Sequence, residues 1–144
     1  MNHASLERCA SCSPSLPAVE HKETVRRFVN EAVNRGRQEI IDDLFTDEMT
    51  EWVREWFGAF RRSFPDLRME LVELVAEGDK VVGRFACSGT HTGEWRGHSP
   101  TGRRFEKVDE VYFFTFAGDR IAGLWGVEDT LDRFDQLGLD PIGQ

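Results

Sequence analysis

The chain has 144 residues and a formal net charge of -8, and a chain of this length can fold as one domain that buries a core without disulfides. The acidic balance argues against a nucleic-acid partner, because phosphate binding needs a clustered excess of Lys and Arg. No apolar run could span a bilayer and the first residues lack the hydrophobic stretch of a secretory signal, so we expect a cytoplasmic protein without a membrane partner. The strong preference for Arg over Lys is typical of a bacterial, GC-rich genome.

The side-chain composition favours large apolar walls and gives no metal site. There are 11 Phe and 4 Trp against 1 Tyr, a bias that can fill a core or line an apolar cavity. Cys9 and Cys12 form a lone CxxC pair, and Cys87 lies far away in a strand pattern. These cysteines cannot build a paired zinc site or a disulfide framework, and no HExxH-like spacing is present, so we expect no metal.

The chain divides into a short tail and one domain. Residues 1–17 are rich in Ser, Pro and Cys, a composition typical of a disordered end. Residues 18–144 are predicted to form a single domain. Its first helix ends near Gly36, and apolar residues fall on one face of it: Val25, Phe28, Val29, Ala32 and Val33.

Two further helical segments precede the strands. Residues 38–45 form a short helical piece with Ile40, Ile41 and Leu44. Thr46 can then cap a third helix that Pro65 ends. The apolar face of that helix is predicted to hold Trp52, Trp56, Phe57 and Phe60.

The rest of the chain is predicted to form long antiparallel strands. Leu67, Met69 and Leu71 alternate with polar residues, and a turn at 77–79 leads into a second strand. Strands over 103–116 and 120–129 follow, joined by a tight turn, and a closing helix over 130–137 ends at Gly138. The order predicts an α+β domain with helices packed on one face of a bent antiparallel sheet.

Several short motifs follow one another over residues 62–139. They are Phe64-Pro65-Asp66-Leu67, Glu77-Gly78-Asp79-Lys80-Val81-Val82, Gly89-Thr90-His91-Thr92-Gly93-Glu94, Pro100-Thr101-Gly102-Arg103, Gly118-Asp119-Arg120-Ile121, and Trp125 with Asp129 four residues later, before Gln136-Leu137-Gly138. In this order they resemble the SnoaL-like polyketide cyclases, or ester cyclases, of the NTF2-like superfamily. The resemblance implies an NTF2-like cone with the pocket inside the curved sheet. The segment that many relatives carry between the second and third helices is shortened here.

The resemblance also implies a function. Family members are cofactor-free enzymes that close a ring in a polyketide by intramolecular aldol condensation, and the family's general base corresponds to Asp129. A hydrophobic small-molecule substrate and a homodimer, or a higher homo-oligomer, are further expectations. Since one fold carries several reactions, the family does not fix the chemistry.

The residues around Asp129 are compatible with that role. A base that removes a proton from carbon needs an apolar surround, and strand alternation places Trp125, Val127 and Asp129 on one face, with Glu128 on the other. The alternative is that Asp129 is the N-cap of the closing helix.

The other predicted site residues are donors and apolar walls. Tyr112 and His91 could donate to an oxyanion, whereas His98 lies in a turn-rich connection and is expected at the rim. The residues expected to contact substrate are Trp125, Trp56, Phe60, Phe85, Arg84 and Phe114.

Two other functions stay open. Epoxide opening or pyran formation would call for two carboxylates and an arginine around a water or hydroxyl, so Glu110 and Arg84 would have to converge with Asp129. A non-catalytic binder of hydrophobic small molecules is the third possibility.

Overall fold

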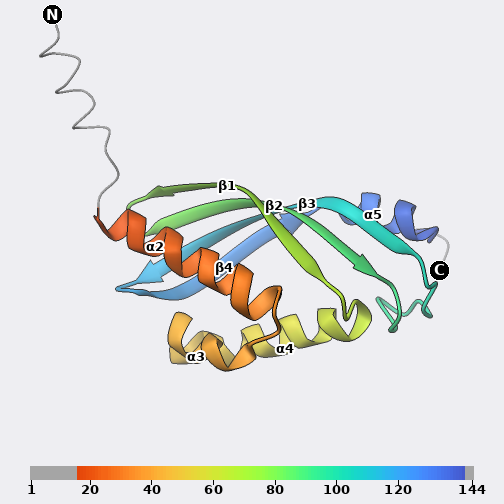
Figure 1. Ribbon diagram of the computed structural model, residues 1–144, viewed down its shortest axis with the longest axis horizontal. Coiled ribbons are helices and arrows are strands. Elements are labelled where there is room, and N and C mark those ends of the chain that lie inside the picture. The colour runs from red at the N-terminus through yellow and green to blue at the C-terminus, as the bar shows by residue number, and fades with distance from the viewer. Residues whose placement is uncertain (1–15, 142–144) are drawn as a thin grey trace, which may run out of the picture.

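Four strands and the helices around them make up the fold, and the computed structural model describes residues 16–141. The strands form one antiparallel sheet in sequence order: β1 (Arg68–Glu77), β2 (Lys80–Thr90), β3 (Arg104–Ala117) and β4 (Arg120–Glu128). The helices are α2 (Leu16–Arg27), the π-helix η1 (Phe28–Val33), the 3-10 helix η2 (Gln38–Ile40), α3 (Ile41–Leu44), α4 (Asp47–Ser63) and α5 (Thr130–Leu137). Figure 1 shows the sheet arching over α2, α3 and α4, with α5 at the other end of the sheet. The α+β, NTF2-like prediction is confirmed.

The first helix has the predicted buried face. Val25, Phe28, Val29, Ala32 and Val33 are all buried, although the helix widens into a π-helix from Phe28 onward. Beyond it, the Asn34 amide donates to the carbonyl of Met69 at 2.8 Å and accepts from the Met69 N–H at 2.7 Å. This two-way bond fastens the end of the helix to the edge strand β1.

The third helix differs from its predicted face in one residue. Thr46 occupies the N-cap of α4 but makes no capping hydrogen bond with its side chain. Phe57 is buried and Trp56 and Phe60 are partly buried, whereas Trp52 is 48% exposed. Trp52 stacks on Trp56 at a ring-centroid distance of 5.7 Å, so it covers a core residue from outside instead of entering the core.

Irregularities at three places bend the sheet. The pairing register shifts between Leu71 and Glu73 in β1, between Cys87 and Gly89 in β2, and between Thr115 and Phe116 in β3. Such bulges increase local twist and bend a strand. The concave face therefore closes around the aromatic core, and α4 lies across it (Figure 1).

The predicted tail boundary needs a small correction. Leu16 and Pro17 already belong to α2, because Pro is well accommodated in the first turn of a helix. The rest of the predicted tail, with Cys9 and Cys12, lies outside the described residues. Within residues 16–141, no helix is both long and apolar enough to cross a membrane.

Candidate active site

A narrow cavity lies between α4 and the concave face of the sheet. Its volume is about 30 Å³, and aromatic and aliphatic side chains form most of its wall. A wider groove of about 570 Å³ lies next to it, and the two share Trp56, Phe60 and Glu128. Glu128 therefore stands where a wide groove meets a narrow apolar cavity.

Two carboxylates face each other at this junction. Glu110 on β3 pairs directly with Glu128 on β4 in the sheet register, and both line the narrow cavity. Like charges directly opposite each other on one face of a sheet destabilise it. The Arg133 guanidinium from α5 relieves this repulsion, because Nη2 donates to Glu110 Oε2 and Nη1 donates to Glu128 Oε1.

Aromatic rings enclose the Arg133 guanidinium. Its central carbon lies 4.6 Å from the ring centroid of Phe105, 5.1 Å from Phe60 and 5.9 Å from Trp95. Arg133 is fully buried, and its Nε atom has no hydrogen-bond partner among the described residues. A charge in such a place is tolerated only because it is paired, so the two carboxylates and the arginine form one unit.

Tyr112 completes the polar group. Its hydroxyl donates to Glu110 Oε1 at 2.7 Å, and its ring lies against Trp56 at a centroid distance of 5.9 Å. Burial raises the pKa of the Glu110 carboxyl, and Arg133 opposes that shift. Burial also raises the pKa of Tyr112, so the phenol keeps its proton. Tyr112 thus lies in the cavity, as expected of a donor.

The structure contradicts the position expected for Asp129. Glu128 is the last residue of β4 and lines the cavity, whereas Asp129 lies just past the end of the strand. Asp129 is exposed and is the N-cap of α5, where its Oδ1 accepts the Asp132 N–H at 3.0 Å. It lines neither the cavity nor the groove, so the local capping interpretation describes its contacts.

Trp125 and Arg84 also lie outside the pocket. Trp125 is 61% exposed on the outer face of the sheet and packs edge-on against Phe113. Arg84 pairs on the same face with Glu73 at 3.2 Å and Asp109 at 3.6 Å. Trp125 was placed on the wrong face because β4 carries apolar side chains on both of its faces, so periodicity could not identify the inner one. Arg84 on β2 alternates with buried neighbours and points outward, as an ion-paired surface residue does.

The remaining aromatic predictions lie in or near the cavity. Trp56, Phe60 and Phe114 line it. Phe85 is fully buried behind Tyr112, with ring centroids 6.1 Å apart, and lies outside the lining. The wall is therefore aromatic as expected, and Phe85 supports it from within the core.

His91 anchors a loop and is not part of the cavity wall. Its Nδ1 accepts the Thr101 N–H at 3.1 Å, and its ring packs against Phe64 and Trp95. Burial lowers the pKa of His91, so the neutral ring is favoured. His98 belongs to the same loop and packs against Phe134. Through Trp95, this loop forms one wall of the groove.

Arg133 was not found by sequence reasoning, and Glu128 was placed only on the face opposite Asp129. An arginine in a short amphipathic helix has the pattern of a surface residue, and nothing nearby indicates burial. Glu110 carries the one useful signal, since it is a carboxylate on the same strand face as Val108, Tyr112 and Phe114. Among the described residues, no three histidine, cysteine or carboxylate side chains lie together in a way that could hold a metal ion.

Comparison with known proteins supports the fold and the family. A candidate SnoaL-like polyketide cyclase from Jannaschia sp. CCS1 has a TM-score of 0.82 at 21% identity, covering 90% of this chain and 99% of that one. TsrD from Streptomyces laurentii has a TM-score of 0.78 at 28% identity, with 86% and 98% covered. IdmH from Streptomyces antibioticus, a candidate polyketide cyclase, has a TM-score of 0.73 at 24% identity, with 83% and 99% covered.

The search among curated proteins found no match. The model of the SnoaL-like polyketide cyclases matches residues 23–137, which include the cavity, the groove and the carboxylate pair with its arginine. The chain therefore belongs to the SnoaL-like polyketide cyclase family.

Proposed function

We propose that this protein is a cofactor-independent cyclase that closes a ring in a polyketide-type substrate by intramolecular aldol condensation, with Glu128 as general base. One observation carries the proposal. Arg133 holds Glu110 and Glu128 together, Tyr112 bonds to Glu110, and the two carboxylates and the phenol line one aromatic cavity beside a groove. A base, a proton donor and an apolar wall are the groups that an aldol closure needs.

The sizes of the two spaces favour the groove as the place where the substrate binds. A cavity of about 30 Å³ holds little more than ordered water, whereas the adjoining groove of about 570 Å³ has room for a polycyclic molecule. A substrate in the groove lies beside Trp56, Phe60 and Trp95. Its reacting carbon then reaches Glu128 at the junction.

Glu128 is the better placed of the two carboxylates to remove a proton from carbon. Its side chain is 26% exposed, and only Oε1 is engaged by Arg133. Oε2 receives no hydrogen bond from another described residue. Glu110 has both oxygens engaged and is buried, so it has no free oxygen to accept a proton from carbon.

Glu128 is proposed to both remove and return the proton. Proton removal by Glu128 leaves an enolate, whose carbon attacks the second carbonyl and forms the new C–C bond. The resulting alkoxide takes up the proton that Glu128 holds, which restores the base, while Tyr112 and Glu110 keep the inner end of the narrow cavity polar. Electrons and protons balance within this cycle, so no cofactor is needed.

Epoxide opening or pyran formation is the second candidate. It is favoured by the specific finding that two carboxylates share one arginine, since one carboxylate can activate water while the protonated other donates. The grouping differs from the predicted one, because Arg133 and Glu128 stand where Arg84 and Asp129 were expected. Non-catalytic binding would leave the two carboxylates with a structural role alone, as ion-pair partners of Arg133.

Neighbouring amide variants test the proposal. Glu128→Gln and Asp129→Asn change the same functional group one residue apart, at the last residue of β4 and at the N-cap of α5. Both are assayed on anthraquinone β-keto esters in deuterated water, following ring closure and deuterium uptake at the acidic carbon. We expect Glu128→Gln to lower both rates about 100-fold or more, and Asp129→Asn to stay within about twofold of the wild type, since Asn is also a good N-cap.

The opposite pattern would restore Asp129 as the base. If the wild type neither closed nor exchanged any ester but hydrolysed aryl epoxides, the second candidate would replace the first. Binding of these compounds without any turnover would favour the non-catalytic alternative.

A further inference from the structure

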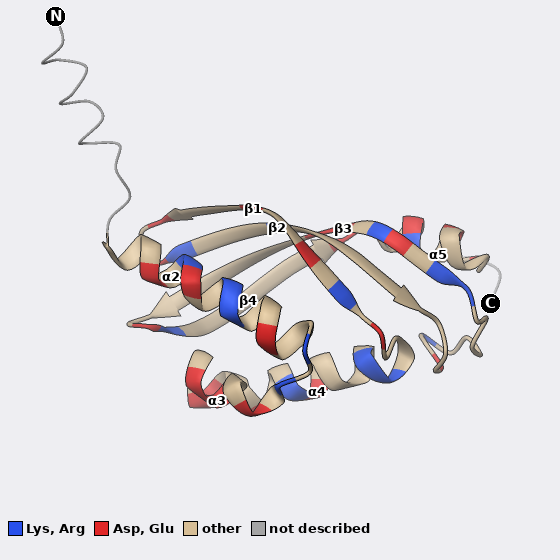
Figure 2. Cartoon of the chain, viewed as in Figure 1, with Lys and Arg blue, Asp and Glu red and all other residues tan. Residues whose placement is uncertain are grey.

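Two arginines at the rim of the groove lack ion-pair partners. Arg62 and Arg96 both line the groove and are exposed, and neither forms a hydrogen bond or ion pair within the described part of the chain. Arg61, next to Arg62, instead donates to the carbonyl of Val33 at 2.6 Å. Figure 2 shows this basic last turn of α4 in blue. The chain has a net charge of -8, and most of the other described arginines form ion pairs. Two unpaired cations at one groove are therefore unusual in this protein.

Arg96 has a backbone conformation that arginine rarely adopts. Trp95 and His98 exchange hydrogen bonds of 3.0 and 2.8 Å around a two-residue turn, and both central residues have positive φ, 49° at Arg96 and 81° at Gly97. Such a turn favours Asn-Gly. Arg fits the first position poorly, so the turn does not explain the arginine, and a strained residue beside a groove suggests a function.

The turn places the arginine over the groove wall. The Arg96 guanidinium carbon lies 5.4 Å from the ring centroid of Trp95, which also lines the groove. In this arrangement the guanidinium can bind an anion, and the aromatic wall can pack against a flat ring.

The other charged groups of the groove leave the rim positive. Glu94 is exposed at the rim, and Glu128 at the inner end is bound by Arg133. The Ser63 hydroxyl is already used, since it donates to the Glu94 carbonyl at 2.5 Å. Two arginines against one free carboxylate therefore face the entrance.

We infer that the groove binds an aromatic substrate that carries an anionic group, a carboxylate, at the end away from the reacting carbon. Arg62 and Arg96 hold the carboxylate at the rim, and the rings lie along Trp56, Phe60 and Trp95 towards Glu128. This inference rests on the proposed function for the direction of the substrate, but the binding itself does not depend on turnover.

The test compares anthraquinone-2-carboxylate with its methyl ester, using calorimetric titration of the full chain. We expect the wild type to bind the acid at least about tenfold more tightly than the ester, and added salt to reduce that preference. Arg62→Gln and Arg96→Asn should each weaken acid binding about fivefold and leave ester binding unchanged. Arg96→Asn also suits the turn better than arginine, so misfolding cannot explain its effect.

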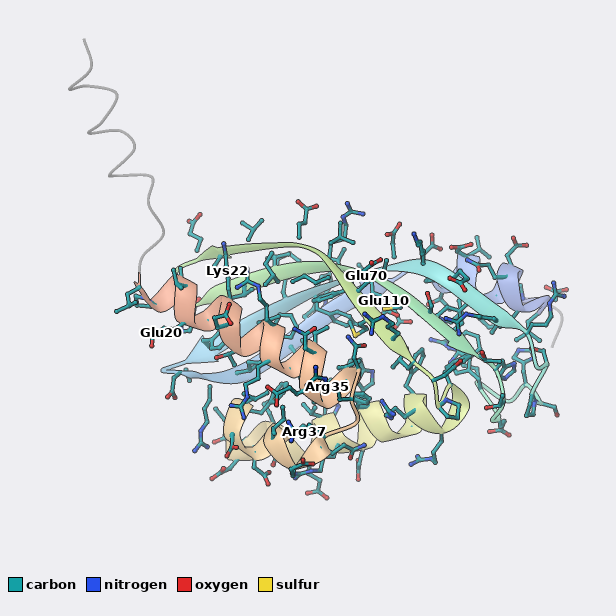
Figure 3. All side chains as sticks on the ribbon, viewed as in Figure 1. Glu20, Lys22, Arg35, Arg37, Glu70 and Glu110 are labelled. Carbon is teal, nitrogen blue, oxygen red and sulfur yellow. The ribbon has the colours of Figure 1, made fainter. Side chains whose placement is uncertain are left out.

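Arg35→Gln is the matched control, because Arg35 is exposed, unpaired among the described residues and outside both cavity and groove (Figure 3). Equal binding of acid and ester, no binding of either at millimolar concentration, or an equal loss in Arg35→Gln would overturn the inference. Glu128→Gln should keep the preference for the acid. If the preference is found but Glu128→Gln turns over normally, only the proposed base is wrong; if the preference is absent but Glu128→Gln is inactive, only this inference is wrong.

Discussion

Glu110 on β3 and Glu128 on β4 are direct partners across the sheet, and one guanidinium, that of Arg133, donates to both. Through these two ion pairs Arg133 joins the closing helix to the sheet, at the point where the cavity meets the groove. A group that holds two like charges together contributes to stability as well as to the site.

Replacing Arg133 by Met should destabilise the fold strongly. It leaves two carboxylates facing each other without a cation, and breaking a buried ion pair costs about 3–5 kcal/mol. Urea denaturation measures the change. Arg84→Met is the control, since Arg84 pairs only on the exposed outer face and should cost at most about 1 kcal/mol. Equal effects of the two substitutions would show that the Arg133 unit is not buried as described.

Glu110→Gln should change how stability depends on pH. Because burial raises the pKa of Glu110 above its ordinary value of 4.5 in the folded state, the unfolded chain loses this proton first as pH rises. The wild type therefore has the full contribution of this group below pH 4.5 and loses it as pH rises through the folded pKa. Glutamine does not titrate, so the difference in unfolding free energy between the two proteins should shift in favour of the variant with rising pH. A pH-independent difference would contradict the raised pKa.

Sequence patterns predicted the elements well but not the inner face of the last strand. Helix and strand positions follow from local periodicity, and α5 has the predicted bounds, Thr130–Leu137. The exposed Trp125 and Val127 made the outer face of β4 look like the inner one. Arg133 could not be predicted, because its burial depends on Glu110, which lies 23 residues earlier in the chain. Tyr112 was predictable because it is the only tyrosine of the chain and is flanked by the apolar residues Val111, Phe113 and Phe114.

Gly126→Ala should displace Tyr112. A Cβ at Gly126 would lie 2.2 Å from Tyr112 Cδ1 and 2.8 Å from the Val111 carbonyl oxygen, so the ring or the strand must move. We expect a loss of about 1–3 kcal/mol, typical of overpacking, and lower activity through the misplaced phenol. Gly123→Ala is the matched control on the same strand, because its Cβ would meet Thr115 at an ordinary 3.4 Å. Thermal unfolding measures the change. An unchanged melting temperature in Gly126→Ala would show that the Tyr112 ring can move aside without cost.

Asp129→Ala should destabilise α5, whereas Asp129→Asn should not. The Asp129 side chain caps the helix through the Asp132 N–H, and loss of such a cap costs about 1 kcal/mol. Asparagine can make the same bond, so comparing the melting temperatures of the two variants separates capping from charge. Equal destabilisation would show that the carboxylate charge matters, and would bring Asp129 back as a functional candidate.

The outer face of the sheet is the surface where we predict that two copies pair. It carries an apolar patch made of Val72, Val75, Phe113, Trp125 and Val127, which are 38–61% exposed. Charges of both signs adjoin it, in Glu73, Arg84 and Asp109, and a patch with both signs can be complementary to a second copy of itself across a two-fold axis. Monomers rarely leave so large a group of apolar side chains uncovered.

Trp125→Arg should therefore convert a dimer into a monomer without loss of fold, because Trp125 is the most exposed aromatic residue of the patch. Size-exclusion chromatography with light scattering, over a range of micromolar concentrations, measures the mass. Trp52→Arg is the control, since Trp52 is 48% exposed on α4, away from this face. A wild type that is monomeric throughout would contradict the interface. Dissociation by Trp52→Arg alone would move it to α4, where it would cover the side of the molecule that carries the groove.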